Sequence, residues 1–254
     1  MYFRSGPPLL LIALVVVLLL GLFIALPVSL VAAAFGKLGL TGAQGLAVFL
    51  LTLVGSRWNL PVYRTTRLVR GEPAPASRLF GFSGQMGRIR FGQPFRQNGF
   101  GAQGDGLLLS EQVVAVNVGG CIVPCLLSAW FLWQMQLSGV LGAWVALCVL
   151  IPALACYLLA KPMPGIGIGV PVLLPPAVAA MTAMILTPEL AGHESLAPRA
   201  AYMAGALGTL IGADLAHLLN RRTLAVLDAP LLSIGGAGTF DGIFLAGIIA
   251  VLLA

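Results

Sequence analysis

Residues 199–218 read RAAYMAGALGTLIGADLAHL, and this stretch decides the class of fold. It is long and apolar enough to cross a bilayer as a helix, since a span needs about 20 mainly apolar residues. Near its end, however, it carries an acid, Asp214. An acid inside a spanning helix is costly, so it marks either a functional site or a structural contact with a partner inside the protein.

The rest of the chain has the same apolar character. Of its 254 residues, 59% are hydrophobic and only 9% are charged. Soluble domains carry about 25% charged residues, so this composition indicates a membrane protein. The apolar runs do not alternate with polar residues, as the strands of a membrane β-barrel would. We therefore expect an all-α fold, a polytopic bundle of transmembrane helices.

Seven segments are candidates for spans, and glycine or proline interrupts some of them. We expect these spans at about 8–34, 40–56, 112–135, 139–160, 164–187, 199–219 and 234–254. The chain then divides into an N-terminal pair of spans (1–56), a basic and flexible cytoplasmic loop (57–110) and a five-span core (111–254). The first apolar run is too long for a typical signal peptide, so we expect it to be retained.

The positions of the cations predict the orientation. With the N-terminus in the cytoplasm, twelve of the fourteen Lys and Arg residues fall on the cytoplasmic side, and only Lys37 and Arg199 face outward. The positive-inside rule therefore favours an inner (cytoplasmic) membrane protein with its C-terminus outside. The expected partners are the lipid bilayer and anionic headgroups that bind the basic loop. Binding of a protein partner stays an open possibility. No nucleic-acid binding is expected, because the positive charge mostly reflects the orientation of the chain in the membrane.

A second acid, Asp241, lies in the last expected span, within SIGGAGTFDGIF at residues 233–244. Asp214 is seven residues before Arg221, just after the sixth span, and Asp241 is seven residues after Ile234, where the seventh begins. Because consecutive spans run antiparallel, both carboxyls are expected about 10 Å below the same cytoplasmic edge. Gly238 and Gly242, four residues apart, would let the last helix approach its neighbour closely.

Irregular or polar positions in other spans supply further candidates. The segment KPMPGIGIGVPVLLPP (161–176) cannot form one straight helix, because each interior proline removes a backbone hydrogen bond. Membrane proteins tolerate such backbone where protein or a wet cavity satisfies it, as at the sites of transporters. His217, one turn from Asp214, is expected to form a hydrogen bond between helices rather than to bind a metal. The candidate residues of a substrate or ion pathway are Asn117, Gly119, Gly120, Gly165, Gly167, Gly169, Pro175, Pro176, His217, Gly238, Thr239 and Gly242.

The two acids lead to three functional hypotheses. Carboxyls within a few ångströms of each other share one proton and titrate as a unit. Such a pair suits the first hypothesis, cation- or proton-coupled transport of a small solute. It also suits a di-aspartyl intramembrane hydrolase with Asp214 and Asp241 as catalytic residues, so enzymatic activity stays open. In the third hypothesis the protein is a non-catalytic assembly subunit, and each acid bonds a threonine (Thr209, Thr239) or free backbone. No metal and no cofactor is expected.

Several segments resemble a family of bacterial and archaeal membrane proteins catalogued only as a domain of unknown function. They are VNVGGCIVP (116–124), PMPGIGIGVP (162–171), RAAYMAGALGTLIGADLAHL (199–218) and SIGGAGTFDGIFLAG (233–247). The resemblance covers most of the chain from about residue 50, and it implies a membrane fold without an established activity.

A weaker similarity is to the intramembrane aspartyl proteases of the presenilin and signal-peptide-peptidase group. Those enzymes carry one Asp on each of two adjacent helices, and Asp214 and Asp241 would correspond to them. This sequence departs from their pattern, because Gly238-Thr239-Phe240-Asp241 stands where they have Gly-x-Gly-Asp. The 27-residue spacing between the acids also leaves little room for the segments that gate substrate in those enzymes.

Overall fold

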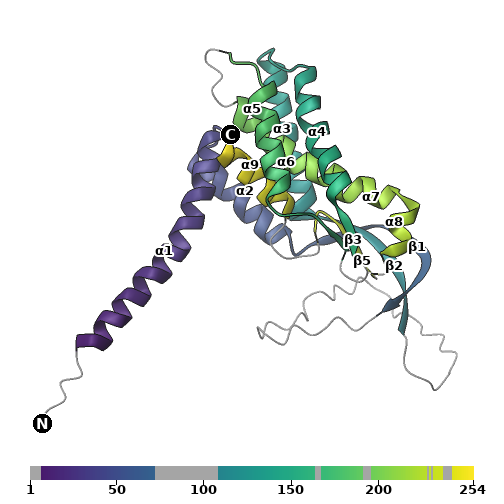
Figure 1. Ribbon diagram of the computed structural model, residues 1–254, viewed down its shortest axis with the longest axis horizontal. Helices are drawn as coiled ribbons and strands as arrows, with labels where there is room; N and C mark the ends of the chain where they lie inside the picture. Colours follow the sequence, from purple (N-terminus) through teal and green to yellow (C-terminus); the bar gives the residue numbers. More distant parts are fainter. Residues whose placement is uncertain are drawn as a thin grey trace, which may run out of the picture.

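The apolar segments fold into helices, most of which gather in a bundle with strands at one end, while α1 projects away from it (Figure 1). This computed structural model describes residues 7–71, 108–163, 167–190, 196–227, 229, 231–236 and 242–254. The helices are α1 Pro7–Lys37, α2 Gly42–Gly55, α3 Val123–Leu137, α4 Ala143–Leu159, α5 Leu174–Leu186, α6 Leu196–Thr209, α7 Ala216–Leu219, α8 Arg221–Val226 and α9 Gly242–Leu253. The strands are β1 Asn59–Gly71, β2 Leu108–Asn117, β3 Lys161–Met163, β4 Gly167–Gly169 and β5 Leu231–Ile234. The π-helical segments η2 (Val118–Ile122) and η3 (Leu210–Leu215) lead directly into α3 and α7.

Among the described residues, three helices are long and apolar enough to cross a membrane: Ile12–Lys37, Val118–Leu137 and Leu196–Leu219. The helices α2, α4, α5 and α9 are apolar but shorter, with 12 to 17 residues each. At 1.5 Å per residue they reach about 18–26 Å, less than the ~30 Å hydrocarbon core. The protein is therefore a helical membrane protein, and the expected count of seven spans is not confirmed.

The structure corrects the all-α expectation, because strands lie at the start of two expected spans, 112–135 and 164–187, and β5 ends where the last was expected to begin. The segment 108–117 is a strand, and its β-branched valines (Val113, Val114, Val116) suit a pleated sheet. In the Gly/Pro-rich segment, residues 161–163 and 167–169 are antiparallel paired strands, named here the hairpin β3–β4, and helix begins only at Leu174. Residues 231–234 also form a strand, and helix resumes at Gly242. An apolar run alone does not distinguish a buried strand from a helix.

A three-stranded sheet with the order β1-β2-β5 lies at one end of the bundle (Figure 1). β1 is antiparallel to β2, and β5 is parallel to β2 on its other side. In this register Asn59 lies opposite Asn117, and Ser233 lies opposite Ala115. β1 and the start of β2 belong to the segment expected to be a flexible loop. That expectation otherwise concerns residues 72–107, which lie outside the described part of the chain.

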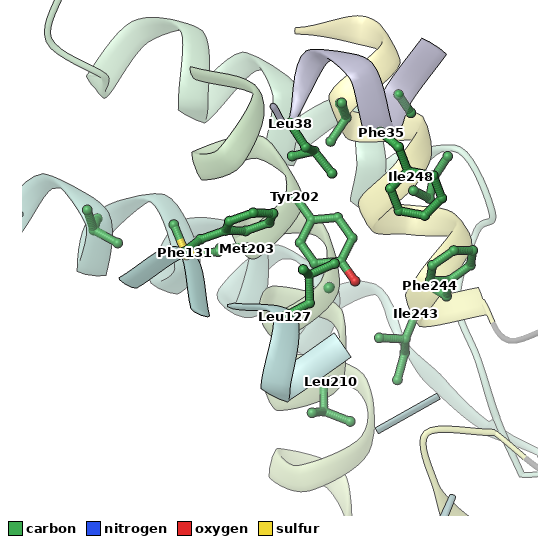
Figure 2. Packing of buried hydrophobic residues seen from close by; sticks show 14 of the residues in the cluster. Phe35, Leu38, Leu127, Phe131, Tyr202, Met203, Leu210, Ile243, Phe244 and Ile248 are labelled. Atoms are coloured by element: carbon green, nitrogen blue, oxygen red, sulfur yellow. The ribbon is translucent and has the colours of Figure 1, made fainter. Parts of the chain in front are cut away.

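The helix α6 is the centre of the bundle and packs against α4, α5 and α9. Glycines permit these contacts: a Cβ on Gly205 would lie 2.7 Å from the Ala246 carbonyl oxygen of α9, and one on Gly208 would lie 2.9 Å from Pro152 Cβ of α4. Small residues at these positions thus let the helices approach closely. Figure 2 shows the buried Tyr202 ring among Leu38, Leu127 and Phe244, which come from three other segments of the chain.

The opposite end of the bundle, near the C-terminus, carries the two cations that were expected to face outward. Lys37 Nζ donates to the carbonyl oxygens of Val251 (3.4 Å) and Leu252 (3.3 Å) at the end of α9. Arg199 Nε donates to the Leu38 carbonyl oxygen, just after α1, at 3.0 Å. The last carbonyls of a helix lack intrahelical partners and carry negative partial charge, so cations stabilise them.

Candidate functional site

Asp214 lies where the central helix is distorted. The helix is regular up to Thr209, then takes π-helical hydrogen bonding through η3 and continues as α7. Such single-turn bulges are frequent at functional sites, because they widen the helix and re-aim side chains. The Asp214 carboxyl is thereby placed on the side of the hairpin β3–β4 and the turn after β5, whose residues line the same cavities.

His217 supports this distorted segment. Its Nδ1 lies 3.1 Å from the Gly212 carbonyl oxygen, and because a carbonyl only accepts, Nδ1 carries the proton. The ring is buried and packs on the ring of Tyr157 in α4, with centroids 4.8 Å apart. The structure thus places His217 between η3 and α4, in a supporting position.

The carboxylate of Asp214 is bonded to backbone. Its Oδ2 accepts a hydrogen bond from the N–H of Gly235 at 2.7 Å. Gly235 follows β5 and has φ +89°, a conformation that favours glycine. A Cβ there would lie 2.7 Å from the backbone nitrogen of Cys121 in η2. Asp214 therefore fixes the turn after β5, and that turn is packed against the π-helical segment η2.

Asn117 is fully buried and holds the sheet to α2 and η2. Its Oδ1 accepts from the Gly120 N–H at 2.8 Å, and its Nδ2 donates to the Ser56 carbonyl oxygen at 2.7 Å and to Asn59 Oδ1 at 3.1 Å. Ser233 Oγ donates to the same Asn59 oxygen at 2.7 Å. A Cβ on Gly119 would overlap the Thr52 carbonyl oxygen. The structure thus gives Asn117, Gly119 and Gly120 a supporting position, beside the turn that Asp214 fixes.

Two cavities meet at Asp214. The larger, of about 410 Å³, lies between the hairpin, α5, η3 and α9, and the smaller, of about 210 Å³, lies between the hairpin, α7 and β5. Three residues line both of them: Asp214, Ile168 and Gly236. The carboxylate therefore belongs to the wall that the two cavities share.

The Gly/Pro-rich segment is part of the same site. The strands β3 and β4 pair antiparallel, with Pro162 opposite Ile168. Gly167 lines the smaller cavity, while Gly169 and Pro175 line the larger. The prolines that begin α5 lie in its first turn, where the missing N–H is not needed. Pro176 is buried beside Pro175 in that turn.

The structure leaves part of the predicted site untested. Asp241, Gly165, Gly238 and Thr239 lie outside the described residues. The carboxylate pair and the role of Thr239 therefore stay predictions. Gly242 is described as the first residue of α9, where it lines the larger cavity.

The close helix approach expected at Gly242 is not seen, because a Cβ there would meet no described atom within 4 Å. In α9 the tight contact is made instead by Gly247, whose added Cβ would lie 3.0 Å from the Tyr202 ring. Of the partners considered for Asp214, a threonine such as Thr209 or a free backbone N–H, the structure shows the backbone N–H of Gly235. Thr209 Oγ1 instead accepts a weak 3.9 Å hydrogen bond from Cys156 Sγ, and Thr209 lines the larger cavity.

Sequence reasoning missed several residues that build the site. Gln112 is buried in β2 and its Nε2 donates to the carbonyl oxygens of Leu227 (2.8 Å) and Ala229 (3.1 Å), which closes the loop before β5. Ile168 and Gly236 separate the cavities, and Ser233 lines the smaller one. Gln112 and Ser233 are polar residues beside or within apolar runs, and that pattern could have identified them as candidate site residues.

These features define an integral membrane protein with an internal polar site. The bundle is apolar, its central helix is distorted, and that helix carries an acid that lines two cavities. The family model described as "Protein of unknown function (DUF1614)" matches residues 53–253, and the chain belongs to this family. This match confirms the resemblance to an uncharacterised family, and the comparison gives no support to the similarity with the di-aspartyl proteases. No curated protein and no solved structure matches the chain.

Proposed function

We propose that this protein carries a small solute or ion across the membrane and that Asp214 is the group that binds the coupled proton or cation. The observation that carries the proposal is the position of the Asp214 carboxyl in the wall shared by two cavities. A group in such a wall can meet a ligand from either side without moving far.

The depth of the carboxyl supports this role. Asp214 is five residues from the end of α7 at Leu219, or about 7 Å along the helix axis. The smaller cavity is bounded by β5 and the residues before it, and the larger one by α5 and α9 within the bundle. Irregular helices around an internal site are characteristic of transporters, because they expose backbone and acids to the ligand.

The surface of the sheet end supports a position at the cytoplasmic interface. Trp58 and Tyr63 are 57% and 63% exposed there, and aromatic residues of this kind favour the headgroup region. The exposed cations Arg57, Arg64 and Lys161 lie at the same end. The positive-inside rule then favours an inner-membrane protein with the sheet on the cytoplasmic side and the C-terminus outside.

The chemistry of the Asp214 carboxylate links the binding of a proton or cation to the contact that holds the turn after β5. A carboxylate has about four acceptor positions, so the bond from Gly235 leaves others free to bind a ligand. A proton on Asp214 weakens the oxygen as an acceptor for the Gly235 N–H, whereas a bound cation leaves the group ionised. Proton and cation therefore compete for one carboxylate, and their exchange alters the contact that holds the turn after β5.

The two other hypotheses depend in part on Asp241 and on residues 72–107, which lie outside the described residues. A di-aspartyl hydrolase needs Asp241 beside Asp214, so that one carboxyl activates water while the other stays protonated. A non-catalytic assembly subunit would depend on a partner bound by residues 57–110. Both stay alternatives to the transport function.

The test uses the full chain reconstituted in proteoliposomes that contain a pH-sensitive dye. Inward gradients of Na⁺, K⁺ or benzyltrimethylammonium are imposed one at a time, and the lumenal pH is recorded. We expect at least one gradient to change the lumenal pH, and we expect Asp214→Asn to reduce that rate by about ten-fold or more, as the loss of a charged partner does. The matched control is Glu189→Gln, because Glu189 is an exposed acid on the connection after α5. Equal rates in Asp214→Asn and the wild type, or no pH change with any gradient, would overturn the proposal.

A further inference from the structure

We propose that the ligand of the larger cavity is a monovalent organic cation with an apolar body, held with its charge at Asp214. The inference rests on the proposed function and names its substrate class. It follows from the charge, the oxygen content and the size of the described lining.

The charge of the lining selects for cations. Of the described residues that line the two cavities, Asp214 carries the only formal charge. No Lys or Arg is among them, so an anionic ligand would meet a carboxylate without a compensating cation. A ligand with a single positive charge would pair with Asp214, which already accepts the Gly235 N–H at 2.7 Å. The attraction between two opposite charges is stronger in a protein interior than in water, because the effective dielectric constant is lower.

The scarcity of oxygen atoms disfavours a bare inorganic ion. Hard cations such as Mg²⁺ and Ca²⁺ are bound by six or more oxygen ligands, counting water. In the described lining, side-chain oxygens come from Asp214 and Thr209 in the larger cavity and from Asp214 and Ser233 in the smaller. Among the described residues no group of three acids, histidines or cysteines could hold a metal ion. An ammonium group needs fewer partners, because it carries its own apolar substituents.

The remaining lining suits an apolar body. The larger cavity has a volume of about 410 Å³, within the range of small-molecule sites. Its walls are aliphatic, with Val170, Pro175, Ile243 and Ile249 among them. Burial of apolar surface against such walls contributes affinity in proportion to the area removed from water. A cation without an apolar body would leave those contacts unmade.

The probe for this inference is benzyltrimethylammonium, whose charge is permanent and whose body is a phenyl ring. Equilibrium binding to the purified full chain in detergent is measured by titration calorimetry. We expect it to bind about ten-fold or more tightly than tetramethylammonium, which lacks the apolar body, and than Na⁺. Benzenesulfonate, which has the apolar body and the opposite charge, is expected not to bind.

Two variants with a control locate the site. Asp214→Asn should weaken binding of benzyltrimethylammonium by about ten-fold or more, because the charged partner is lost. Val172→Trp should also weaken it, because Val172 lines the larger cavity and is 76% exposed, so a larger side chain fills the cavity's edge without disturbing the core. Met181→Trp is the control, since Met181 is similarly exposed on α5 and lines neither cavity. Circular dichroism and gel filtration verify that each variant is folded.

The outcomes separate this inference from the proposed function. Equal binding of Na⁺ or tetramethylammonium, binding of benzenesulfonate, or unchanged affinity in folded Asp214→Asn would overturn the organic-cation assignment. If any of these results is obtained but a Na⁺ or K⁺ gradient still drives Asp214-dependent pH changes, the transport function is retained and only the substrate class is contradicted. Binding of benzyltrimethylammonium without any Asp214-dependent pH change would instead remove the transport function.

Discussion

The backbone N–H of Gly235 donates to Oδ2 of Asp214 at 2.7 Å, which joins the turn after β5 to the distorted segment of the central helix. The same glycine lies against η2, because a Cβ on it would be 2.8 Å from the carbonyl carbon of Gly120. One contact thus connects three segments that are distant in sequence, around residues 120, 214 and 235. Any change at this point is expected to affect the sheet, the central helix and the two cavities together.

The first prediction concerns Gly235 itself. Gly235→Ala should lower the free energy of unfolding by about 1–3 kcal/mol, because φ +89° is strained for alanine and the new Cβ has no space. Thermal unfolding of the purified protein in detergent measures the change. Gly21→Ala is the matched control, because a Cβ at Gly21 in α1 meets no atom within 4 Å. A melting temperature equal to that of the wild type in Gly235→Ala would show that the turn is not held as described.

A second prediction tests the buried amide of Asn117. Asn117→Asp keeps the shape but replaces the Nδ2 donor with an acceptor, which then faces the Ser56 carbonyl oxygen and Asn59 Oδ1. Loss of these bonds should cost about 1–3 kcal/mol of unfolding free energy, since buried acceptors are left unpaired. The readout is the melting temperature, with Gln136→Glu, an exposed position at the end of α3, as the control. A variant as stable as the wild type would contradict the network.

The third prediction concerns orientation in the membrane. Glu189→Cys, on the exposed connection after α5, should react with a membrane-impermeant maleimide in intact cells when the native cysteines are replaced by alanine. Arg57→Cys, at the sheet end, should react only after the membrane is permeabilised. These expectations follow from the excess of cations at the sheet end. The reverse labelling pattern would place the sheet outside and contradict the assigned topology.

Much of the helical framework was predictable from the sequence. The span expected at 199–219 is the helix Leu196–Leu219, and the one expected at 139–160 is the helix Ala143–Leu159. In both cases a long apolar run is bounded by polar or glycine residues, so the length and composition of the run are enough to predict the helix. The association of the Gly/Pro-rich segment with Asp214 was also predictable in outline, because irregular backbone and an acid both need a polar or wet interior.

The sheet and the bond to Asp214 were not predictable in the same way. The valines of β2 form an apolar run that reads equally well as the start of a span, and its partner β1 begins in an arginine-rich segment without an apolar pattern. Strand pairing depends on residues distant in the sequence, such as Asn59 and Asn117. A free backbone N–H was among the partners considered for Asp214, but no side-chain pattern identifies the N–H of Gly235. The expectation of an acidic partner at Asp241 stays a prediction.

Proton release on cation binding tests the central claim most directly. The purified full chain is placed in weakly buffered solution, benzyltrimethylammonium and Na⁺ are added in separate titrations, and the change of pH is recorded. If proton and cation compete for Asp214, the bound cation displaces protons from the wild type and its affinity falls as the pH is lowered. Asp214→Asn should then release no proton and bind weakly at every pH. Cation binding without proton release in the wild type, or equal release by Asp214→Asn, would contradict the account.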